Sequence, residues 1–370
     1  MFRSCILLLI LTLPAAAQVD FRISGYAVNF PIYQRTNSFL AGLVGTDQNQ
    51  FTDVTRLRIR PSVGLWEDTF VMLEYEINAT YFSSPQILLL PLSQSPGRVF
   101  DLTWNPVKKP RWNVVHFIDR LYLKQITDRL DLTIGRQRIS WGTGRIWNPT
   151  DLFNPINPTS FAKLEKDGVD AVVVKFIMGN FTDISFVVNP GNEWEDANLG
   201  VRLRTNVEAY DFSLMGGTFS DGLVLGGDFA GSILDAGVRG EAIHSWSKSA
   251  RGPSYAKFIL GIDNQFTEEF YALAEYHFNG QGRNRVFEYE LFALRSGSIL
   301  NLGRQFMTIQ GSYLVHPLIT VSAGYTNSFT DGSGFATGSV AYSAAEFLTC
   351  SAGGQVFHGD DFDEYWYYPT

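Results

Sequence analysis

The sequence predicts an all-β fold: a transmembrane antiparallel β-barrel of about 16 to 18 strands, with short periplasmic turns and long outer loops. Three observations predict it. About seventeen stretches alternate polar and apolar residues, tight and long connections alternate between them, and no apolar run is long enough for a spanning helix. Backbone N–H and C=O groups inside lipid must be paired within the protein, so a chain without such helices crosses a membrane as a closed sheet.

The first seventeen residues precede this pattern and have the features of a secretory signal peptide. A short apolar run from Ile6 to Leu13 is followed by three alanines, and cleavage is expected before Gln18. The apolar run is too short to span a bilayer. The chain is therefore expected to consist of a signal peptide, residues 1–17, and a single barrel domain, residues 18–370.

The composition narrows the class of partner. Without Arg3, which leaves with the signal peptide, 28 of the 29 basic residues remain against 37 acidic ones, and this balance argues against nucleic acid as a partner. Only Cys350 remains of the two cysteines, so no intrachain disulfide can form. Aromatic residues make up 14% of the chain and its mean hydropathy is close to zero, which suits a wall with one face toward lipid and one toward water.

The second and third predicted strands, 54–66 and 70–82, each carry charge on one face. Strict alternation places five charged residues on faces expected to line the lumen: Arg56, Arg58, Arg60, Glu74 and Glu76. Two interpretations stay open. The arginines favour passage of anions, or cross-strand pairs of arginine and glutamate neutralise each other and stiffen the wall.

Two further arginine pairs are expected to line the lumen, Arg136 with Arg138 and Arg202 with Arg204. The alternation before Arg136 would point the first pair at lipid. We therefore predict a β-bulge at Gly135, because one extra residue reverses the faces that follow it. Asp119 has the same difficulty, which a second bulge or a pairing with Arg120 or a neighbouring strand would resolve.

The connection 143–167 is long and contains three Asn-Pro pairs, each of which favours a turn. We expect this segment to fold into the barrel as a constriction; a compact outer loop that caps the strands is the alternative. The residues assigned to the constriction are Trp147, Asn148, Asp151, Asn154 and Asn157.

Within this region the chain resembles uncharacterised porin-like outer-membrane β-barrel proteins of Gram-negative bacteria. The resemblance rests on Gly135-Arg136-Gln137, Trp141-Gly142, Asn148-Pro149-Thr150-Asp151 and Asn154-Pro155, with a weaker match in the segment EYHFNGQG at 275–282. It implies a channel-like protein of the bacterial outer membrane. Many such barrels end in an aromatic residue, whereas this chain ends in Pro369-Thr370.

Closure of the barrel depends on the number of strands and on the end of the chain. A barrel with both ends in the periplasm needs an even number of strands, and seventeen stretches are recognisable, so sixteen or eighteen strands are expected. The tail EYWYYPT is one candidate for a short closing strand. The acidic residues just before and within it are expected to form a solvated loop.

An enzyme is the less favoured interpretation, because the chain lacks a recognisable nucleophile and base pair. His277 is the only candidate for a lipid hydrolase on the outer wall, and no serine follows it two residues later. The other histidines stand singly, without metal-ligand spacing. We expect no catalysis, no cofactor and no metal.

These features together favour a passive outer-membrane channel for small hydrophilic solutes, including anions if the arginines are free. Its expected partners are outer-membrane lipids and the solutes themselves. Association into a homo-oligomer is common among porins but no residue here demands it. Two alternatives stay open: a sealed barrel with a structural or export-complex role and no conductance, and a lipid-modifying barrel enzyme.

Overall fold

A computed structural model describes residues 20–84, 97–154, 165–191, 196–219, 222–248, 254–295 and 299–369. The predicted signal peptide and the predicted constriction residue Asn157 lie outside these ranges.

The chain forms one antiparallel sheet of eighteen strands, which confirms the predicted all-β class and the predicted strand number. The strands are β1 Phe21–Arg35, β2 Asn49–Trp66, β3 Thr69–Phe82, β4 Thr103–Lys108, β5 Trp112–Ile126, β6 Leu130–Gln137, β7 Val169–Ile177, β8 Asp183–Asn189, β9 Asn198–Val207, β10 Tyr210–Phe219, β11 Gly222–Ile233, β12 Ala236–Ser247, β13 Tyr255–Gln265, β14 Phe270–Asn279, β15 Gln305–His316, β16 Ile319–Ser328, β17 Gly334–Ala345 and β18 Leu348–His358.

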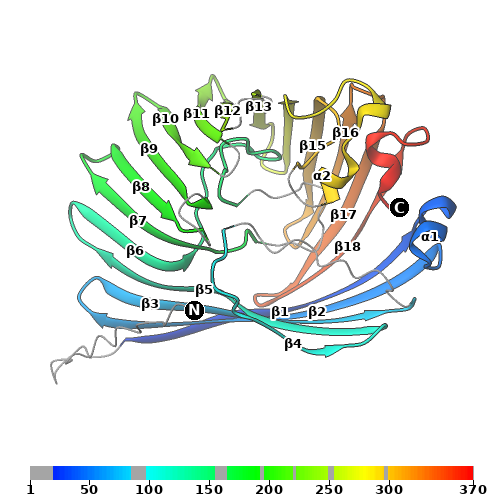
Figure 1. The fold of residues 1–370 in the computed structure, drawn as a ribbon, viewed down its shortest axis with the longest axis horizontal. Coiled ribbons are helices and arrows are strands. Elements are labelled where there is room, and N and C mark those ends of the chain that lie inside the picture. The colour runs from blue at the N-terminus through cyan, green and yellow to red at the C-terminus, as the bar shows by residue number, and fades with distance from the viewer. Residues whose placement is uncertain are drawn as a thin grey trace.

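The sheet curves around a central space (Figure 1). Each strand pairs with its neighbour in the chain, except that β3 pairs with β5. The short β4 pairs with the first half of β5, residues 113–117. β4 arises within 83–112, which the sequence pattern marks as a long connection. Setting β4 aside leaves seventeen strands in antiparallel succession, so β1 and β18 run in the same direction. Among the described residues no ladder joins these two edges.

Alternation explains why these segments become strands with two different faces. In β11, Leu223 and Leu225 are exposed whereas Val224 between them is buried. In β13, Leu260 and Ile262 are exposed whereas Ile259 is fully buried. The outer face is therefore an apolar surface of the kind that lipid covers, and the inner face packs against chain segments inside the curve.

The two predicted bulges have different outcomes. A register shift in the β3 and β5 ladder leaves Asp119 as the extra residue between Ile118 and Arg120, which confirms the bulge there. The predicted bulge at Gly135 is wrong, because the ladders of β6 with β5 and β7 run through it without a shift. Gly135 instead takes a φ of +120°, which only glycine adopts readily, and the next residue, Arg136, is buried.

The C-terminal tail does not form the closing strand considered above. It forms the 3-10 helix η3 Glu364–Tyr367, and Glu364 and Tyr365 are buried, so a fully solvated acidic loop is also wrong. The tail lies beside α1 Ser38–Val44 at the end of β1 (Figure 1). Trp366 and Phe362 contact Phe39 there, with ring centroids 5.7 and 6.2 Å apart from that of Phe39.

Two short helical turns, η2 Val286–Glu288 and α2 Leu291–Arg295, lie between β14 and β15. In the part of the chain that the structure describes, no helix combines the length and apolar character required to span a membrane.

Candidate functional site

The segment between β6 and β7 runs inside the curve of the sheet (Figure 1). We call residues 138–168 the inward loop; its described parts are 138–154 and 165–168. Glu241 of β12 holds the first part of this loop. Its carboxylate accepts backbone N–H groups of Thr143, Gly144 and Thr150 at 2.5, 2.6 and 3.0 Å, and the Thr150 hydroxyl at 2.7 Å.

Glu275 of β14 holds the next part of the loop in the same way. It accepts the backbone N–H groups of Arg145, Ile146 and Trp147 at 2.8, 3.1 and 2.7 Å. Both glutamates are nearly inaccessible to solvent, 3% for Glu241 and 1% for Glu275. Hydrogen bonds to a charged acceptor are stronger than neutral ones, so the two carboxylates fix the course of the loop.

Apolar packing fixes the beginning and the end of this stretch. Trp141 and Phe153 contact edge to face at 5.1 Å and belong to a buried cluster with wall residues of β7, β8 and β10 to β12. Gly200 of β9 leaves room for them, because a Cβ there would lie 2.7 Å from the Trp141 ring and 3.1 Å from the Phe153 ring. The loop is therefore a packed inner layer of the protein.

Trp147 joins the loop to a second buried cluster, which includes wall residues of β13, β15 and β17. Its ring stacks on His277 of β14 at 5.1 Å and lies 6.0 Å from Phe306 of β15. Tyr365 of the tail belongs to the same cluster. His277 thus lies inside the barrel, whereas the lipid-hydrolase alternative requires it on the outer wall.

Several polar residues of the inward loop pair with other residues of the same loop. Asp151 forms an ion pair with Lys166; burial raises the pKa of Asp151 to about 6, although the lysine lowers it. Asn154 accepts the N–H of Ile139 at 3.2 Å and donates to the carbonyl of Asp167. Asn148 accepts the N–H of Asp151 through its carbonyl at 3.1 Å.

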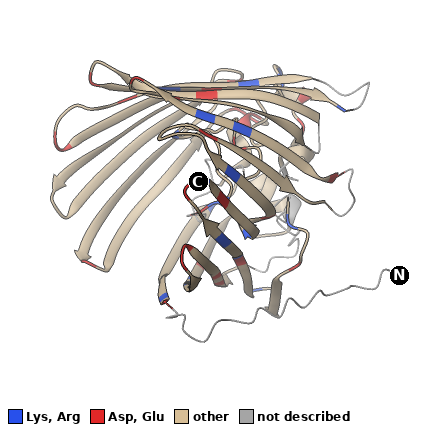
Figure 2. Ribbon diagram, turned by 90° about the vertical axis from the view of Figure 1, so that its left-hand side faces the viewer, with Lys and Arg blue, Asp and Glu red and all other residues tan. Residues whose placement is uncertain are grey.

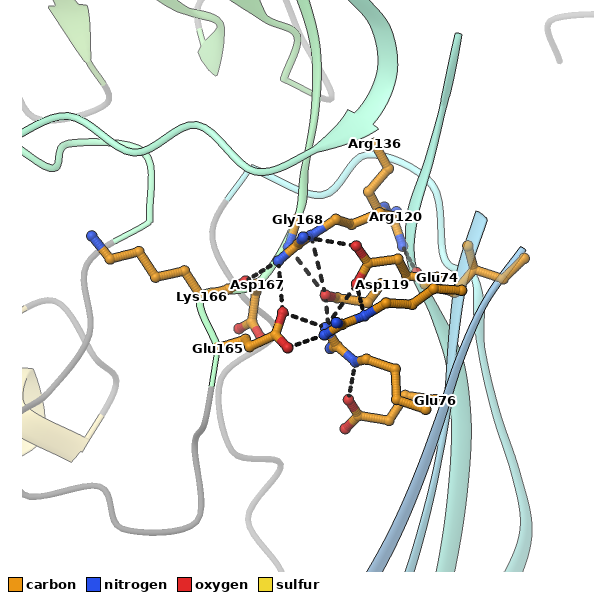
Figure 3. Close-up of polar contacts among 12 residues, drawn as sticks. Glu74, Glu76, Asp119, Arg120, Arg136, Glu165, Lys166, Asp167 and Gly168 are labelled. Carbon is orange, nitrogen blue, oxygen red and sulfur yellow. Dashed lines mark hydrogen bonds and ion pairs between the residues drawn. The ribbon is translucent and has the colours of Figure 1, made fainter. Parts of the chain in front are cut away.

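The charged residues of β2, β3 and β5 form a compact ion-pair network (Figure 3). Arg58 is its centre: its guanidinium lies 2.9 Å from Glu74, 2.7 Å from Glu76 and 2.9 Å from Asp119. Arg98 also pairs with Asp119, at 2.7 Å, and Arg120 pairs with Glu74, at 2.8 Å. These arginines are compensated by carboxylates of the wall itself.

Glu165 connects the inward loop to this network. In Figure 3 it points from the loop toward Arg120 on β5. Its carboxylate lies 2.9 Å from Arg58 and 3.1 Å from Arg120, and it also pairs with Arg60. The far end of the loop is therefore held by charge, whereas Glu241 and Glu275 hold the near end through backbone N–H groups.

Of the other arginines predicted to line the lumen, Arg56 joins this network through Glu76, and the rest have separate environments. Arg56 pairs with Glu76 at 3.1 Å, and Arg136 pairs with Asp170 of β7 at 2.8 Å. Arg202 pairs with Asp228 of β11 at 3.3 Å, and the half-exposed Arg204 pairs with Asp183 at 3.1 Å. Arg138 is exposed just after β6. Figure 2 shows the same pattern at larger scale, with basic residues placed near acidic ones along the strands.

A second segment also lies against the inner wall. The N–H groups of Val99 and Phe100 donate to Asp170 at 2.7 and 3.0 Å. The carbonyl of Phe100 in turn accepts a hydrogen bond from Arg136. Asp170 therefore holds a loop and an arginine at once, which the sequence pattern did not indicate.

Sequence reasoning missed the anchoring roles of Glu241, Glu275 and Glu165. Glu241 and Glu275 lie on inner faces, as any polar residue of an alternating strand does, and their partners are 91 to 130 residues away in the chain. The one available signal was a glutamate among small or apolar neighbours, as in Gly240-Glu241-Ala242. No group of three or more metal-ligating side chains occurs among the residues described by the structure.

An eighteen-stranded antiparallel sheet with a long loop packed against its inner face defines a porin-type β-barrel. Solved structures share this fold. OccK9 (OpdG) of Pseudomonas aeruginosa has a TM-score of 0.62 and 11% identity, over 92% of this chain and 94% of that chain. A BenF-like porin from Pseudomonas fluorescens Pf-5 has a TM-score of 0.58 and 9% identity, over 94% and 96% of the two chains.

OccK8 (OprE) of Pseudomonas aeruginosa is similar to the same degree, with a TM-score of 0.57 and 12% identity over 92% of this chain and 94% of that chain. No family model and no curated protein sequence matches the chain. The comparisons therefore show the fold, which is that of a porin barrel.

Proposed function

We propose that this protein is an outer-membrane channel through which small hydrophilic solutes diffuse passively, and that the inward loop forms its constriction. The observation that carries the proposal is the anchoring of the loop inside the barrel by Glu241 and Glu275. A loop held across the lumen narrows it while leaving the wall intact, which is how a wide barrel becomes selective for size.

The membrane location follows from the two faces of the wall. Exposed Leu223, Leu225, Leu260 and Ile262 suit contact with lipid. The edges β1 and β18 carry backbone groups that cost several kcal/mol each if unpaired in lipid. We infer that these edges pair in the membrane, in a parallel ladder, because they run in the same direction. The partners proposed are therefore outer-membrane lipids and permeating solutes, and homo-oligomerisation stays a prediction.

Liposome swelling tests the channel. Liposomes that contain the refolded protein are diluted into isotonic solutions of neutral sugars of increasing size. Swelling that slows as the sugar becomes larger is expected for a pore narrowed by the inward loop. Folding is monitored in the same sample by circular dichroism, and folded, inserted protein without swelling for any sugar would contradict the proposal.

A sealed barrel is the second candidate, and one observation favours it. Besides the inward loop, the segment that includes Val99 and Phe100 and the tail residue Tyr365 also pack inside the curve of the sheet. A barrel filled in this way would be structural and would give no swelling. The lipid-modifying alternative is less favoured, since His277 stacks between Trp147 and Phe306.

A further inference from the structure

Arg145 occupies a distinctive position on the inward loop. The N–H groups of Thr143 and Gly144 donate to Glu241, whereas that of Arg145 itself donates to Glu275. The backbone is thus fixed on both sides of one bend. The Arg145 side chain is exposed, and among the described residues it forms no ion pair within 4.0 Å.

The arginines of the wall differ from Arg145 because carboxylates compensate them. Arg58 meets three carboxylates of the wall and Glu165 of the loop. Arg136 and Arg202 each have an aspartate partner. These groups are buried or half-buried, so their net effect on an ion in the lumen is small compared with that of an exposed, unpaired guanidinium.

Arg239 of β12 lies near Arg145, but a carboxylate compensates its charge. Arg239 of β12 donates to the carbonyl of Thr143 at 3.2 Å and pairs with Asp263, and its charge interacts with that of Arg145. Glu241 and Glu275 carry negative charge nearby. Both glutamates are buried between the wall and the loop, and each accepts several backbone N–H groups. The Arg145 side chain, in contrast, is exposed to water.

We propose that Arg145 determines the ion preference of the constriction and favours small anions over cations. This inference rests on the proposed channel function and names the residue that would set its selectivity. It replaces the sequence-based assignment of that role to six wall arginines whose charges are paired with carboxylates: Arg56, Arg58, Arg60, Arg136, Arg202 and Arg204.

The test is the reversal potential of the protein in a planar bilayer with a tenfold KCl gradient. The wild-type chain should prefer chloride, and R145Q should lower the ratio of chloride to potassium permeability by about threefold, since one exposed charge acts on each passing ion. R145E should lower it further, whereas R145K should retain it. R285Q removes an exposed arginine from the loop between β14 and β15 and should leave the ratio unchanged.

Liposome swelling by a neutral sugar shows for each variant that the pore is folded and open. Open channels of R145E with the wild-type reversal potential would overturn the inference and leave the channel function standing. A wild-type preference for potassium would overturn it as well. Absence of current from inserted wild-type protein would overturn the channel function and this inference with it.

Discussion

Individual carboxylates in this protein act in two ways. Some form ion pairs with guanidinium groups, as Asp119 does with Arg58 and Arg98. Others accept hydrogen bonds from backbone N–H groups of segments inside the barrel, as Glu241 and Glu275 do. The first kind ties strands together, and the second kind determines where an irregular segment lies. Removal of either kind leaves buried partners without a charge or an acceptor, which is costly.

Substitution of Asp119 should have the larger effect on stability. Asp119 is fully buried and pairs with three arginines, so D119A leaves cations uncompensated and should lower the free energy of unfolding by about 3 to 5 kcal/mol. The measurement is urea unfolding in lipid vesicles, followed by tryptophan fluorescence.

D183A provides the matched control, because Asp183 pairs with the half-exposed Arg204. Its cost should stay below about 1 kcal/mol, since exposed ion pairs contribute little. Equal effects of the two substitutions would contradict the assignment of Asp119 to the centre of the network.

For single residues, the sequence pattern predicts which face of the sheet a side chain occupies more readily than it predicts the partner of that side chain. Alternation predicted that Arg58 and Glu76 share the inner face, and the register places them opposite each other. It could not predict that Arg136 would be buried without a bulge. The positive φ of Gly135 occurs where β6 is paired with both β5 and β7, and these pairings are not visible in the local sequence. Partners such as Trp147 and Glu275, 128 residues apart, are brought together by the curvature of the whole sheet and leave no local pattern.

At the scale of elements, the inward loop and the C-terminal tail share one apolar cluster. Trp147 of the loop and Tyr365 of the tail belong to one buried cluster with Phe306 of β15 and Phe335 of β17. The Asn-Pro pairs predicted a turn-rich segment, and its inward course depends on anchors that belong to other strands.

Release of the inward loop should widen the pore. The double variant E241A/E275A removes the acceptors of seven hydrogen bonds, at about 1 kcal/mol for each. Single-channel conductance should rise and larger sugars should enter liposomes. E67A removes an exposed glutamate at the turn between β2 and β3 and should change neither quantity; equal conductance of both variants would exclude the loop as the constriction.

Docking of the tail should depend on pH through Glu364. Its carboxylate accepts the N–H groups of Leu302 and Gly303 at 2.7 and 2.6 Å. Burial raises its pKa from 4.5 to about 8, opposed by the Gly303 N–H and supported by the charge of Asp331. The docked state thus binds the proton more tightly than the released state, so docking is strongest below pH 4.5 and weakens as pH rises to about 8.

A spin label on D361C in a C350S background measures this release. Label mobility should increase between pH 4.5 and 8, and E364Q should remove most of that dependence. A mobility that is constant over this range in the protein with Glu364 intact would show that the carboxylate does not control docking.

At the scale of the whole molecule, the sheet is continuous from β1 to β18, and among the described residues no ladder joins these two edges. Sequence periodicity predicted almost every strand because one face of each is apolar. It could not predict β4, whose few residues lie within a long connection, or the end of the chain, where a 3-10 helix replaces a strand. At the long-loop end the gap holds a cavity of about 390 Å³, lined by residues of both edges and of the tail.

Pairing of the two edges in lipid is testable with the exposed thiol of Cys350 in β18. A cysteine placed at Ile23 or Ala27 in β1 should form a cross-link to Cys350 with a short bifunctional reagent in vesicles. L214C on β10 lies far around the sheet and should not. Absence of cross-links from both β1 positions would argue against closure through these edges.

We propose that this barrel encloses a conducting pore, and the decisive measurement of this claim is single-channel recording of the refolded mature chain. Discrete, repeated current steps in a planar bilayer are the result expected from a pore held open around an anchored loop. Silence from protein shown to be folded and inserted in the same membrane would contradict the claim and would favour a sealed barrel.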